Sequence, residues 1–332
     1  MSSSKPKKHM NYYDIIIIGA GPIGIACGIE AQKKNISHLI LEKGCLVNSI
    51  FHYPTNMIFF STSDRLEIGD IPFVSHGDKP TRRESLEYYR RVTESWKLNV
   101  KTYEEVKNIF SNDAGFKVET SKVEYKAKKI IIATGFFDFP NLLNIPGEEM
   151  PKVKHYFDEV HPYAYLNVVV IGGGNSAVDV ALETFRKKAN VTMVIREDKL
   201  KDSIKYWVRP DIENRIKEGS IKLFFNSKVT EIRDTEVDVV TPEGKISLQN
   251  DFVFAMTGYH PDYKFLKDVG IRISGDEMMI PEFNSETHES NVPGIYVAGV
   301  VCGGMETGKW FIENARFQAV SILDDISIKV KH

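Results

Sequence analysis

The sequence predicts an α/β protein with two Rossmann-like dinucleotide-binding domains of the three-layer ββα type. Three observations predict this fold. A glycine fingerprint follows a buried strand and opens a helix at two places, Gly19 and Gly172. A strand that ends in Thr-Gly follows each fingerprint, at 129–135 and at 252–258. The length of 332 residues also fits two domains, since one domain averages roughly 150 residues.

The composition excludes several protein classes. Hydrophobic residues make up 42% and charged residues 27%, as in ordinary globular proteins, so fibrous and disordered proteins are excluded. The net charge of -2 offers no field that would gather nucleic acid or a membrane surface. The three cysteines, Cys27, Cys45 and Cys302, contain no CxxC pair and suit a reducing cytoplasm rather than a disulfide framework. No His/Cys cluster has metal-ligand spacing, so no metal is expected.

The amino terminus resembles a secretory signal, because lysines at 5, 7 and 8 precede an apolar run over 15–29. Asp14 and the glycines of the run oppose that interpretation, and the run is too short to span a bilayer. We therefore expect residues 1–10 to be a disordered leader, with Met10 as an alternative start, and no transmembrane helix.

The first fingerprint belongs to a βαβ unit. A strand is expected at 14–18, a helix at 22–34 and a second strand at 38–41, which ends at Glu42. The fingerprint itself, G-x-G-x-x-G, occupies 19–24 and includes Pro22 and Ile23. Strand, helix and terminal acid together make dinucleotide binding the preferred interpretation over a plain glycine-rich turn.

Each residue of this pattern has a physical role. Gly19 permits the tight turn, Gly21 lets the backbone approach a pyrophosphate, and Gly24 lets the helix pack on the strand. The helix N-terminus supplies free N–H groups and partial positive charge. Glu42 can accept hydrogen bonds from the hydroxyls of an adenosine ribose.

The second fingerprint, G-x-G-x-x-A, follows a strand at 167–171 and opens a helix that runs to about Lys187. Its residues include Gly172, Gly174, Asn175, Ser176 and Ala177. The next strand, at 190–195, ends in Arg196 rather than in an acid. Arginine suits the 2'-phosphate of NADPH, so NADPH is favoured, although Glu197 and Asp198 keep NADH open.

Two fingerprints imply two dinucleotides, as in proteins that bind FAD and a nicotinamide cofactor together. We expect a discontinuous FAD-binding domain over 11–137 and 259–332, interrupted by an NADPH-binding domain over 138–258. Further expected elements are strands within 98–110 and 116–125, a helix at 211–219, a three-stranded meander over 221–248, a strand at 294–299 and a helix at 310–326.

The sequence resembles the thioredoxin reductase fold and, more closely, the YpdA family of bacillithiol disulfide reductases. The resemblance covers nearly the whole chain. The matching segments include Glu42–Asn48, Phe59–Ser63, Leu66–Phe73, Ser203–Lys205, Phe254–Tyr263 and Phe311–Asn314. The resemblance implies an FAD- and NADPH-dependent oxidoreductase that passes hydride from NADPH to flavin N5 and on to a low-molecular-weight disulfide. It also implies a homodimer or homotetramer.

The resemblance also implies site residues. For FAD they are Gly19, Gly21, Pro22, Ile23, Gly24, Glu42, Lys43, Asn48, His52, Thr134, Gly135 and Gly299. For NADPH they are Gly172, Gly174, Asn175, Ser176, Ala177, Arg196 and Lys205. The broader fold carries an aspartate after the late Ala-Gly that binds the ribityl chain, and Val300 occupies this position.

One departure bears on catalysis. Several members of the family carry Gly-Pro-Cys-Gly in the first fingerprint, whereas this chain has Ile23, which forms no thiolate. Cys302 and Cys27 are weak candidates for a redox thiol, and a structural role is expected for all three cysteines. A ferredoxin- or flavodoxin-NADP reductase, which needs no thiol, is therefore the main alternative. A flavin monooxygenase and a non-catalytic cofactor sensor remain further alternatives.

Overall fold

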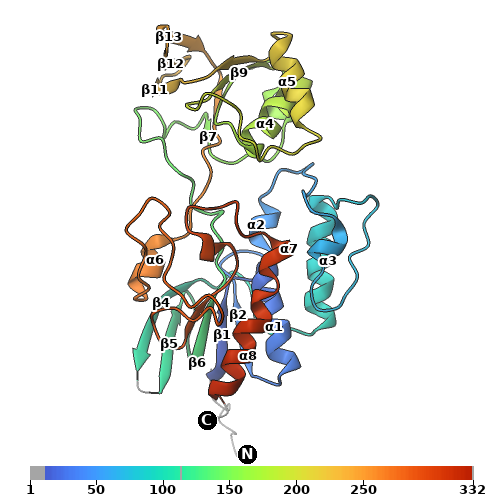
Figure 1. Ribbon diagram of the computed structural model, residues 1–332, viewed down its shortest axis with the longest axis vertical. Helices are drawn as coiled ribbons and strands as arrows, with labels where there is room; N and C mark the ends of the chain where they lie inside the picture. The colour runs from blue at the N-terminus through green and yellow to red at the C-terminus, as the bar shows by residue number, and fades with distance from the viewer. Residues whose placement is uncertain (1–11, 113, 331–332) are drawn as a thin grey trace, which may run out of the picture. The chain divides into compact units, whose positions relative to one another are not determined.

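The computed structural model describes residues 12–112 and 114–330 (Figure 1). The leader expected over residues 1–10 and the alternative start at Met10 lie outside this part. Packing divides the chain into two units, which we describe one at a time. Within the described residues, the first unit consists of 12–51, 61–112, 114–139 and 259–330, and the second consists of 52–60 and 140–258.

A parallel sheet forms the centre of the first unit. β1 (Tyr12–Ile18) pairs with β2 (His38–Leu41) on one edge and with β6 (Glu124–Ile132) on the other. β3 (Val100–Lys101) extends the sheet beyond β2, and β15 (Ile295–Val297) pairs with the end of β6. The isoleucines of β1 are almost fully buried, as an unbroken β-branched run predicts for a strand covered on both faces.

The long strand β6 pairs with different strands along its two halves. Its first half pairs with an antiparallel hairpin, β4 (Val106–Asn112) and β5 (Gly115–Thr120), whereas its second half pairs with β15. Helices α1 (Pro22–Lys33) and α8 (Gln318–Val330) lie side by side against the parallel strands (Figure 1). Hairpin, sheet and helices give the expected ββα arrangement, and the predicted α/β class is confirmed.

The other helices of the first unit lie in its long connections. Thr81 caps α3 through a capping box with Glu84, as a Thr-x-x-Glu pattern allows. The helices are α2 (Asn48–Phe51), α3 (Arg82–Ser95), α6 (Tyr263–Asp268), and the 3₁₀ turns η1 (Ser63–Leu66) and η3 (Gly299–Gly303).

The single helix predicted over 310–326 is wrong, because the chain forms two helices there. α7 (Ile312–Ala315) ends before Arg316, and α8 starts at Gln318. The Arg316 guanidinium donates to the carbonyl oxygens of Asp64 and Glu67 beside the η1 turn. These hydrogen bonds hold the chain on η1 at the break, an arrangement that the apolar spacing of the segment does not encode.

The second unit has its own parallel sheet. β8 (Asn167–Ile171) lies at its centre between β9 (Asn190–Val194) and β14 (Phe252–Ala255). β10 (Lys222–Phe224) extends the sheet beyond β9, and β7 (Val153–Lys154) extends it beyond β14. All four pairings are parallel, which matches a second Rossmann-like unit.

Three antiparallel strands form a separate meander in this unit. The prediction that the meander starts at residue 221 is wrong, because residues 222–224 pair with β9 and belong to the parallel sheet. Short apolar segments of this kind fit either sheet, and pairing partners decide between them. The remaining elements are α4 (Asn175–Arg186), α5 (Arg209–Lys217), η2 (His161–Tyr163), β11 (Lys228–Ile232), β12 (Glu236–Thr241) and β13 (Gly244–Gln249).

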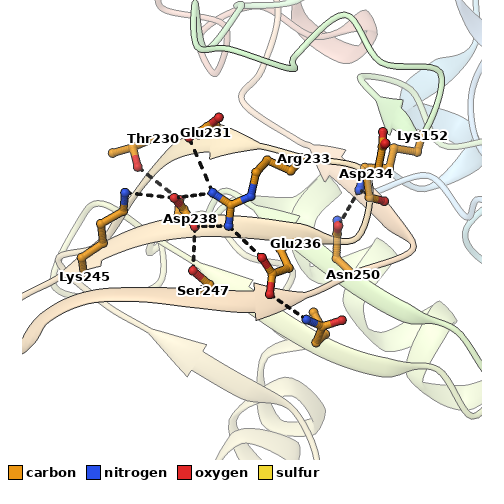
Figure 2. Close-up of polar contacts among 11 residues, drawn as sticks. Lys152, Thr230, Glu231, Arg233, Asp234, Glu236, Asp238, Lys245, Ser247 and Asn250 are labelled. Atoms are coloured by element: carbon orange, nitrogen blue, oxygen red, sulfur yellow. Dashed lines mark hydrogen bonds and ion pairs between the residues drawn. The ribbon is translucent and has the colours of Figure 1, made fainter.

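A buried carboxylate ties the meander together (Figure 2). Asp238 on β12 accepts two hydrogen bonds from the Arg233 guanidinium, at 2.7 and 2.8 Å. Ser247 and Lys245 on the neighbouring strand also donate to it, at 2.7 and 2.9 Å. The Arg233 guanidinium, followed by these two groups, holds the pKa of Asp238 far below its ordinary value.

The segment 52–60 packs with the second unit, although the residues on both sides of it belong to the first. The Thr55 N–H donates to the Asp158 carbonyl oxygen at 2.8 Å. The Phe60 ring lies 5.4 Å from the Trp207 ring between centroids. The predicted FAD-binding domain over 11–137 includes this segment, whereas packing groups it with the second unit. Within the described ranges, no helix is long and apolar enough to cross a membrane.

Candidate dinucleotide-binding sites

The turn between β1 and α1 uses its three glycines in two ways. A Cβ on Gly19, whose φ is +105°, would lie 2.4 Å from the Ala133 carbonyl oxygen. A Cβ on Gly24 would lie 1.9 Å from the Gly19 carbonyl oxygen. By contrast, a Cβ on Gly21 would meet no described atom within 4 Å. Two glycines therefore serve close packing, and the third presents its backbone to open space where a ligand fits.

The amino terminus of α1 has the donors that a pyrophosphate needs. Gly21 is the N-cap, and among the described residues no side chain caps the helix. Pro22 has no N–H, and the Ile25 N–H already donates to the Gly21 carbonyl oxygen at 2.9 Å. The helix therefore leaves the N–H groups of Ile23 and Gly24 for an anionic partner, which its dipole also favours. These residues fit the pyrophosphate of a dinucleotide.

Glu42 lies at the end of β2, next to the fingerprint, and is 7% exposed. Its carboxylate accepts hydrogen bonds from the N–H groups of Ala20 at 2.9 Å and Gly44 at 2.8 Å. Burial raises the pKa of Glu42, and the two N–H groups oppose that shift. Each carboxylate oxygen has a further lone pair, so Glu42 can also accept a ribose hydroxyl.

The loop after Glu42 carries three further predicted residues. Lys43 forms an ion pair with Asp138 at 2.9 Å, a partner that the sequence analysis did not identify. The Asn48 side-chain oxygen accepts from the Cys45 N–H at 3.3 Å and so closes the loop before α2. His52 lies in the segment that packs with the second unit, so the first unit does not group it with Lys43 and Asn48.

The carboxyl ends of β6 and β15 bring the late turns to the same edge of the sheet. Thr134 and Gly135 follow β6, and Gly135 has a φ of +73°. Gly299 follows β15 with a φ of +81°, and a Cβ on it would lie 3.3 Å from the Ile23 side chain. The late Ala-Gly turn therefore packs against the first turn of α1.

One buried residue at this edge carries no signal in the sequence. Gln318, the first residue of α8, accepts a hydrogen bond from the Gly299 N–H at 2.6 Å and is 4% exposed. Its side-chain nitrogen is buried and has no hydrogen-bond partner among the described residues. No local signal marks Gln318, because the predicted helix ran straight through this position.

The turn of the second fingerprint, between β8 and α4, repeats the geometry of the first fingerprint with one difference. A Cβ on Gly172, whose φ is +126°, would lie 2.5 Å from the Met256 carbonyl oxygen. A Cβ on Gly174 would meet only the flexible Lys201 stem, at 3.7 Å. Where the first fingerprint requires glycine, this one has Ala177, whose Cβ would lie 3.5 Å from a Cβ on Gly172. The second turn is thus wide enough for alanine.

The amino terminus of α4 is open in the same way. Gly174 is the N-cap, no described side chain caps the helix, and the Val178 N–H donates to the Gly174 carbonyl oxygen at 3.1 Å. The N–H groups of Asn175, Ser176 and Ala177 are therefore left for an anion. These residues fit the pyrophosphate of a nicotinamide dinucleotide.

Two predicted NADPH residues hold each other in place. The Asn175 side chain donates to the Ser203 carbonyl oxygen at 2.9 Å and accepts from the Lys205 N–H at 2.9 Å. The Lys205 ammonium forms an ion pair with Asp179 at 2.7 Å. Both residues therefore lie beside the α4 turn, and their polar groups fix the loop that follows β9.

Arg196 lies two residues after β9, and its side chain is 81% exposed. Its guanidinium forms an ion pair with Glu197 at 3.0 Å. Desolvation alone would raise the pKa of Glu197, but the hydrogen bonds and charges around it, above all from Arg196, lower that pKa overall. The exposed arginine is therefore free to turn toward a phosphate, at the position where NADP-binding folds carry a basic residue.

Burial raises the pKa of all three thiols. Cys27 on α1 is 0% exposed, and burial raises its pKa to about 12. Cys302 in η3 is 2% exposed, and burial raises its pKa well above the ordinary value. Cys45 is partly exposed, and burial again raises its pKa. Within the described part of the chain, no group of three or more His, Cys, Asp or Glu side chains is placed to hold a metal.

Comparison with known proteins gives consistent results. The family model described as pyridine nucleotide-disulphide oxidoreductase matches residues 16–299. The bacilliredoxin reductase Bdr of Bacillus subtilis (strain 168) is 44% identical over 319 residues, which is 96% of this chain and 98% of that protein.

Two solved structures extend the likeness to the fold. The bacillithiol disulfide reductase Bdr (YpdA) from Staphylococcus aureus superimposes with a TM-score of 0.94 at 42% identity, covering 96% of this chain and 99% of that one. A thioredoxin reductase from T. acidophilum superimposes with a TM-score of 0.75 at 23% identity, covering 97% and 100%, which extends the similarity at the level of the fold alone.

Proposed function

We propose, from the premise that the chain belongs to the pyridine nucleotide-disulphide oxidoreductase family, that it reduces a low-molecular-weight thiol disulfide with electrons from NADPH. The predicted resemblance to the YpdA family is confirmed by these relatives. The chain is an oxidoreductase, and its cofactors are FAD and a nicotinamide dinucleotide. When bound, the flavin takes up a hydride from the nicotinamide and passes two electrons on to the acceptor.

We assign FAD to the first unit. The fingerprint residues Gly19, Gly21, Ile23 and Gly24 offer backbone N–H groups and space to the pyrophosphate, and Glu42 receives the ribose. Five other predicted residues lie at the same edge of the first unit's sheet: Lys43, Asn48, Thr134, Gly135 and Gly299. Pro22 instead opens α1, and His52 lies in the second unit.

We assign NADPH to the second unit. Gly172, Gly174, Ser176 and Ala177 form the open turn and helix terminus that receive the pyrophosphate. Arg196 receives the 2'-phosphate, because it is exposed just after β9. Asn175 and Lys205 act on the nucleotide indirectly in this proposal: they hold the loop after β9 beside the turn.

The proposed substrate is bacillithiol disulfide. One NADPH supplies a hydride, solvent supplies a proton, and one S–S bond breaks to give two thiols and NADP⁺. The observation that carries the substrate class is the 42% identity, over 96% of this chain, with a solved structure described as a bacillithiol disulfide reductase. The two open helix termini, each beside a glycine turn, support the binding of one dinucleotide in each unit.

The test uses the purified FAD-loaded enzyme under anaerobic conditions. NADPH should bleach the flavin, and bacillithiol disulfide should then restore the oxidised spectrum and support continued NADPH consumption. Glutathione disulfide and cystine serve as matched disulfide controls. If NADPH consumption does not rise when bacillithiol disulfide is added, the proposed substrate is refuted while the oxidoreductase assignment stands.

A second candidate is electron transfer to ferredoxin or flavodoxin. Two observations favour it: the first fingerprint has Ile23 where several YpdA-family members carry a cysteine, and burial raises the pKa of all three thiols. A one-electron carrier needs no enzyme thiol. If this candidate holds, the enzyme should reduce ferredoxin with NADPH, and the reduced ferredoxin should in turn reduce cytochrome c. Absence of cytochrome c reduction would exclude this candidate.

We further propose a homodimer or homotetramer that works in the cytoplasm, where three unpaired cysteines stay reduced. Light scattering of the purified holoprotein measures the assembly. A monomeric mass at micromolar concentration would contradict this part of the proposal.

A further inference from the structure

Glu104 is a buried acid in the first unit that the proposed chemistry does not use. It lies in the segment after β3 and is 3% exposed. The Tyr125 hydroxyl on β6 donates to its Oε1 at 2.9 Å, and the Thr120 hydroxyl oxygen on β5 lies 2.8 Å from the same atom. A carboxylate persists in the interior only where such contacts offset its lost hydration. The Glu104 side chain is therefore fastened to the antiparallel layer of the unit.

The chemistry of the donors fixes the direction of these hydrogen bonds. The Lys101 ammonium donates to the Tyr125 hydroxyl oxygen at 2.7 Å, and an ammonium group can only donate. The phenol oxygen therefore accepts from Lys101, and its single hydrogen goes to Glu104. Cation, phenol and carboxylate form one hydrogen-bonded chain, in which each charged end strengthens the bond to the phenol.

The backbone around Glu104 holds the loop that carries Glu42. The Glu104 N–H donates to the Glu42 carbonyl oxygen at 2.8 Å, and the Glu42 N–H donates to the Lys101 carbonyl oxygen at 2.9 Å. The Tyr103 N–H donates to the Gly44 carbonyl oxygen, also at 2.9 Å. These bonds continue the pairing of β2 with β3 beyond the ends of both strands. The position of Glu42 therefore depends on the segment after β3.

This segment contains a residue in an unfavourable backbone conformation. Tyr103 has a φ of +53°, in the left-handed region that a residue with a Cβ rarely adopts. Such a conformation persists only where the surrounding contacts impose it. Glu104, the next residue, supplies such a contact through its bond from Tyr125.

We propose that Glu104 is a positioning residue for the FAD site: the hydrogen bond from Tyr125 anchors the segment after β3, and the main-chain bonds of that segment hold the Glu42 carboxylate at the ribose of FAD. The inference rests on the FAD assignment of the proposed function and deepens it. In this proposal Glu104 acts through the Glu42 loop and makes no contact with the nucleotide.

The test titrates the apoprotein with FAD and follows the quenching of flavin fluorescence. Tyr125→Phe removes the anchoring donor, and Glu104→Leu removes its acceptor. Each should raise the FAD dissociation constant about 10-fold, because the Glu42 loop loses its fixed position. Glu104→Gln keeps a side-chain oxygen that accepts from Tyr125, so its dissociation constant should stay within about twofold of wild type.

The matched control is Tyr296→Phe, which removes another buried tyrosine hydroxyl from the same unit. The Tyr296 hydroxyl also donates to a carboxylate, that of Asp325 at 2.6 Å, but this bond joins β15 to α8 rather than to the Glu42 loop. Tyr296→Phe should leave the FAD dissociation constant unchanged. The thermal midpoint of each apoprotein establishes that the variants are folded.

A double-mutant cycle separates positioning from a general loss of stability. Glu42→Gln alone should raise the FAD dissociation constant about 10-fold, because it weakens the acceptor of the ribose hydroxyls. If Tyr125 acts through Glu42, adding Tyr125→Phe to Glu42→Gln should raise the constant by less than about twofold more. A general loss of stability would instead multiply the two effects.

Five results would overturn the proposal: wild-type affinity for FAD in both Tyr125→Phe and Glu104→Leu, wild-type affinity in Glu42→Gln, equal losses in Glu104→Gln and Glu104→Leu, equal losses in Tyr125→Phe and Tyr296→Phe, or independent losses in the double variant. The titration uses neither NADPH nor disulfide. A failure of the proposed substrate therefore leaves this test readable, and a failure here leaves the disulfide assay readable.

Discussion

Removing the thiols tests the proposed electron path most directly. Cys27 and Cys302 are buried, and Cys45 is only partly exposed. Burial raises the pKa of Cys27 from 9.0 to about 12, which lowers its thiolate fraction at pH 7 roughly 1000-fold. A thiol in this state is a poor nucleophile. We therefore expect that electrons reach the acceptor without an enzyme thiol.

The perturbation is the triple variant Cys27→Ala, Cys45→Ser, Cys302→Ala. Each buried Cys→Ala change removes one sulfur from a packed core and should lower the free energy of unfolding by about 1 kcal/mol. The rate of flavin reduction by NADPH and the steady-state rate with bacillithiol disulfide should both stay within about twofold of wild type, a change in activation free energy of less than about 0.5 kcal/mol.

Two assays check this expectation. Stopped-flow absorbance separates flavin reduction from flavin reoxidation by the disulfide, and alkylation of the native protein measures the reactivity of each thiol. Cys27 should react far more slowly than a free cysteine, because it is fully buried and its pKa is raised, whereas all three thiols should react at ordinary rates in urea. Loss of reoxidation in the triple variant, with flavin reduction intact, would refute the reasoning and identify a redox thiol.

Three further predictions follow from single contacts. Gly24→Ala places a Cβ 1.9 Å from the Gly19 carbonyl oxygen, so the helix and turn must separate, at a cost of about 1–3 kcal/mol. The purified variant should retain less FAD and release it at a lower temperature, and full flavin content would contradict the steric argument. Arg196→Met should raise the KM for NADPH about 10- to 100-fold and leave the KM for NADH unchanged, because only NADPH carries the 2'-phosphate; equal effects on both nucleotides would remove Arg196 from that role. Asp238→Asn should lower the melting temperature of the protein at neutral pH. Since the Arg233 contact depresses the folded pKa of Asp238 below its ordinary 3.8, the advantage of the wild type is present above that pH and should shrink as the pH falls below it. A pH-independent difference between the two melting temperatures would show that the charge of Asp238 is irrelevant.

The sequence alone determined the two dinucleotide turns. In each of them the deciding residues lie within six consecutive positions, and their chemistry is local: a positive φ at Gly19 and Gly172, and a helix that begins where a strand ends. The parallel sheets were predictable for the same reason, because unbroken β-branched runs such as 15–18 record burial on both faces.

The spacing of apolar residues could not determine where a helix breaks. It also could not determine which sheet a short strand joins. The break at Arg316 depends on carbonyl oxygens at Asp64 and Glu67, far away in the sequence. The same limit applies to residues 222–224, whose pairing with β9 is a choice between two available sheets.

Only the tertiary structure decided the state of the polar and sulfur groups. The Lys205 ammonium has a partner in Asp179, and the half-satisfied Gln318 amide meets Gly299 from a distant helix. The burial that raises the Cys27 pKa likewise comes from the helix–sheet contact. Hydrogen bonding and desolvation depend on which segments meet in space, and this information is spread over the whole chain rather than stored in any one motif.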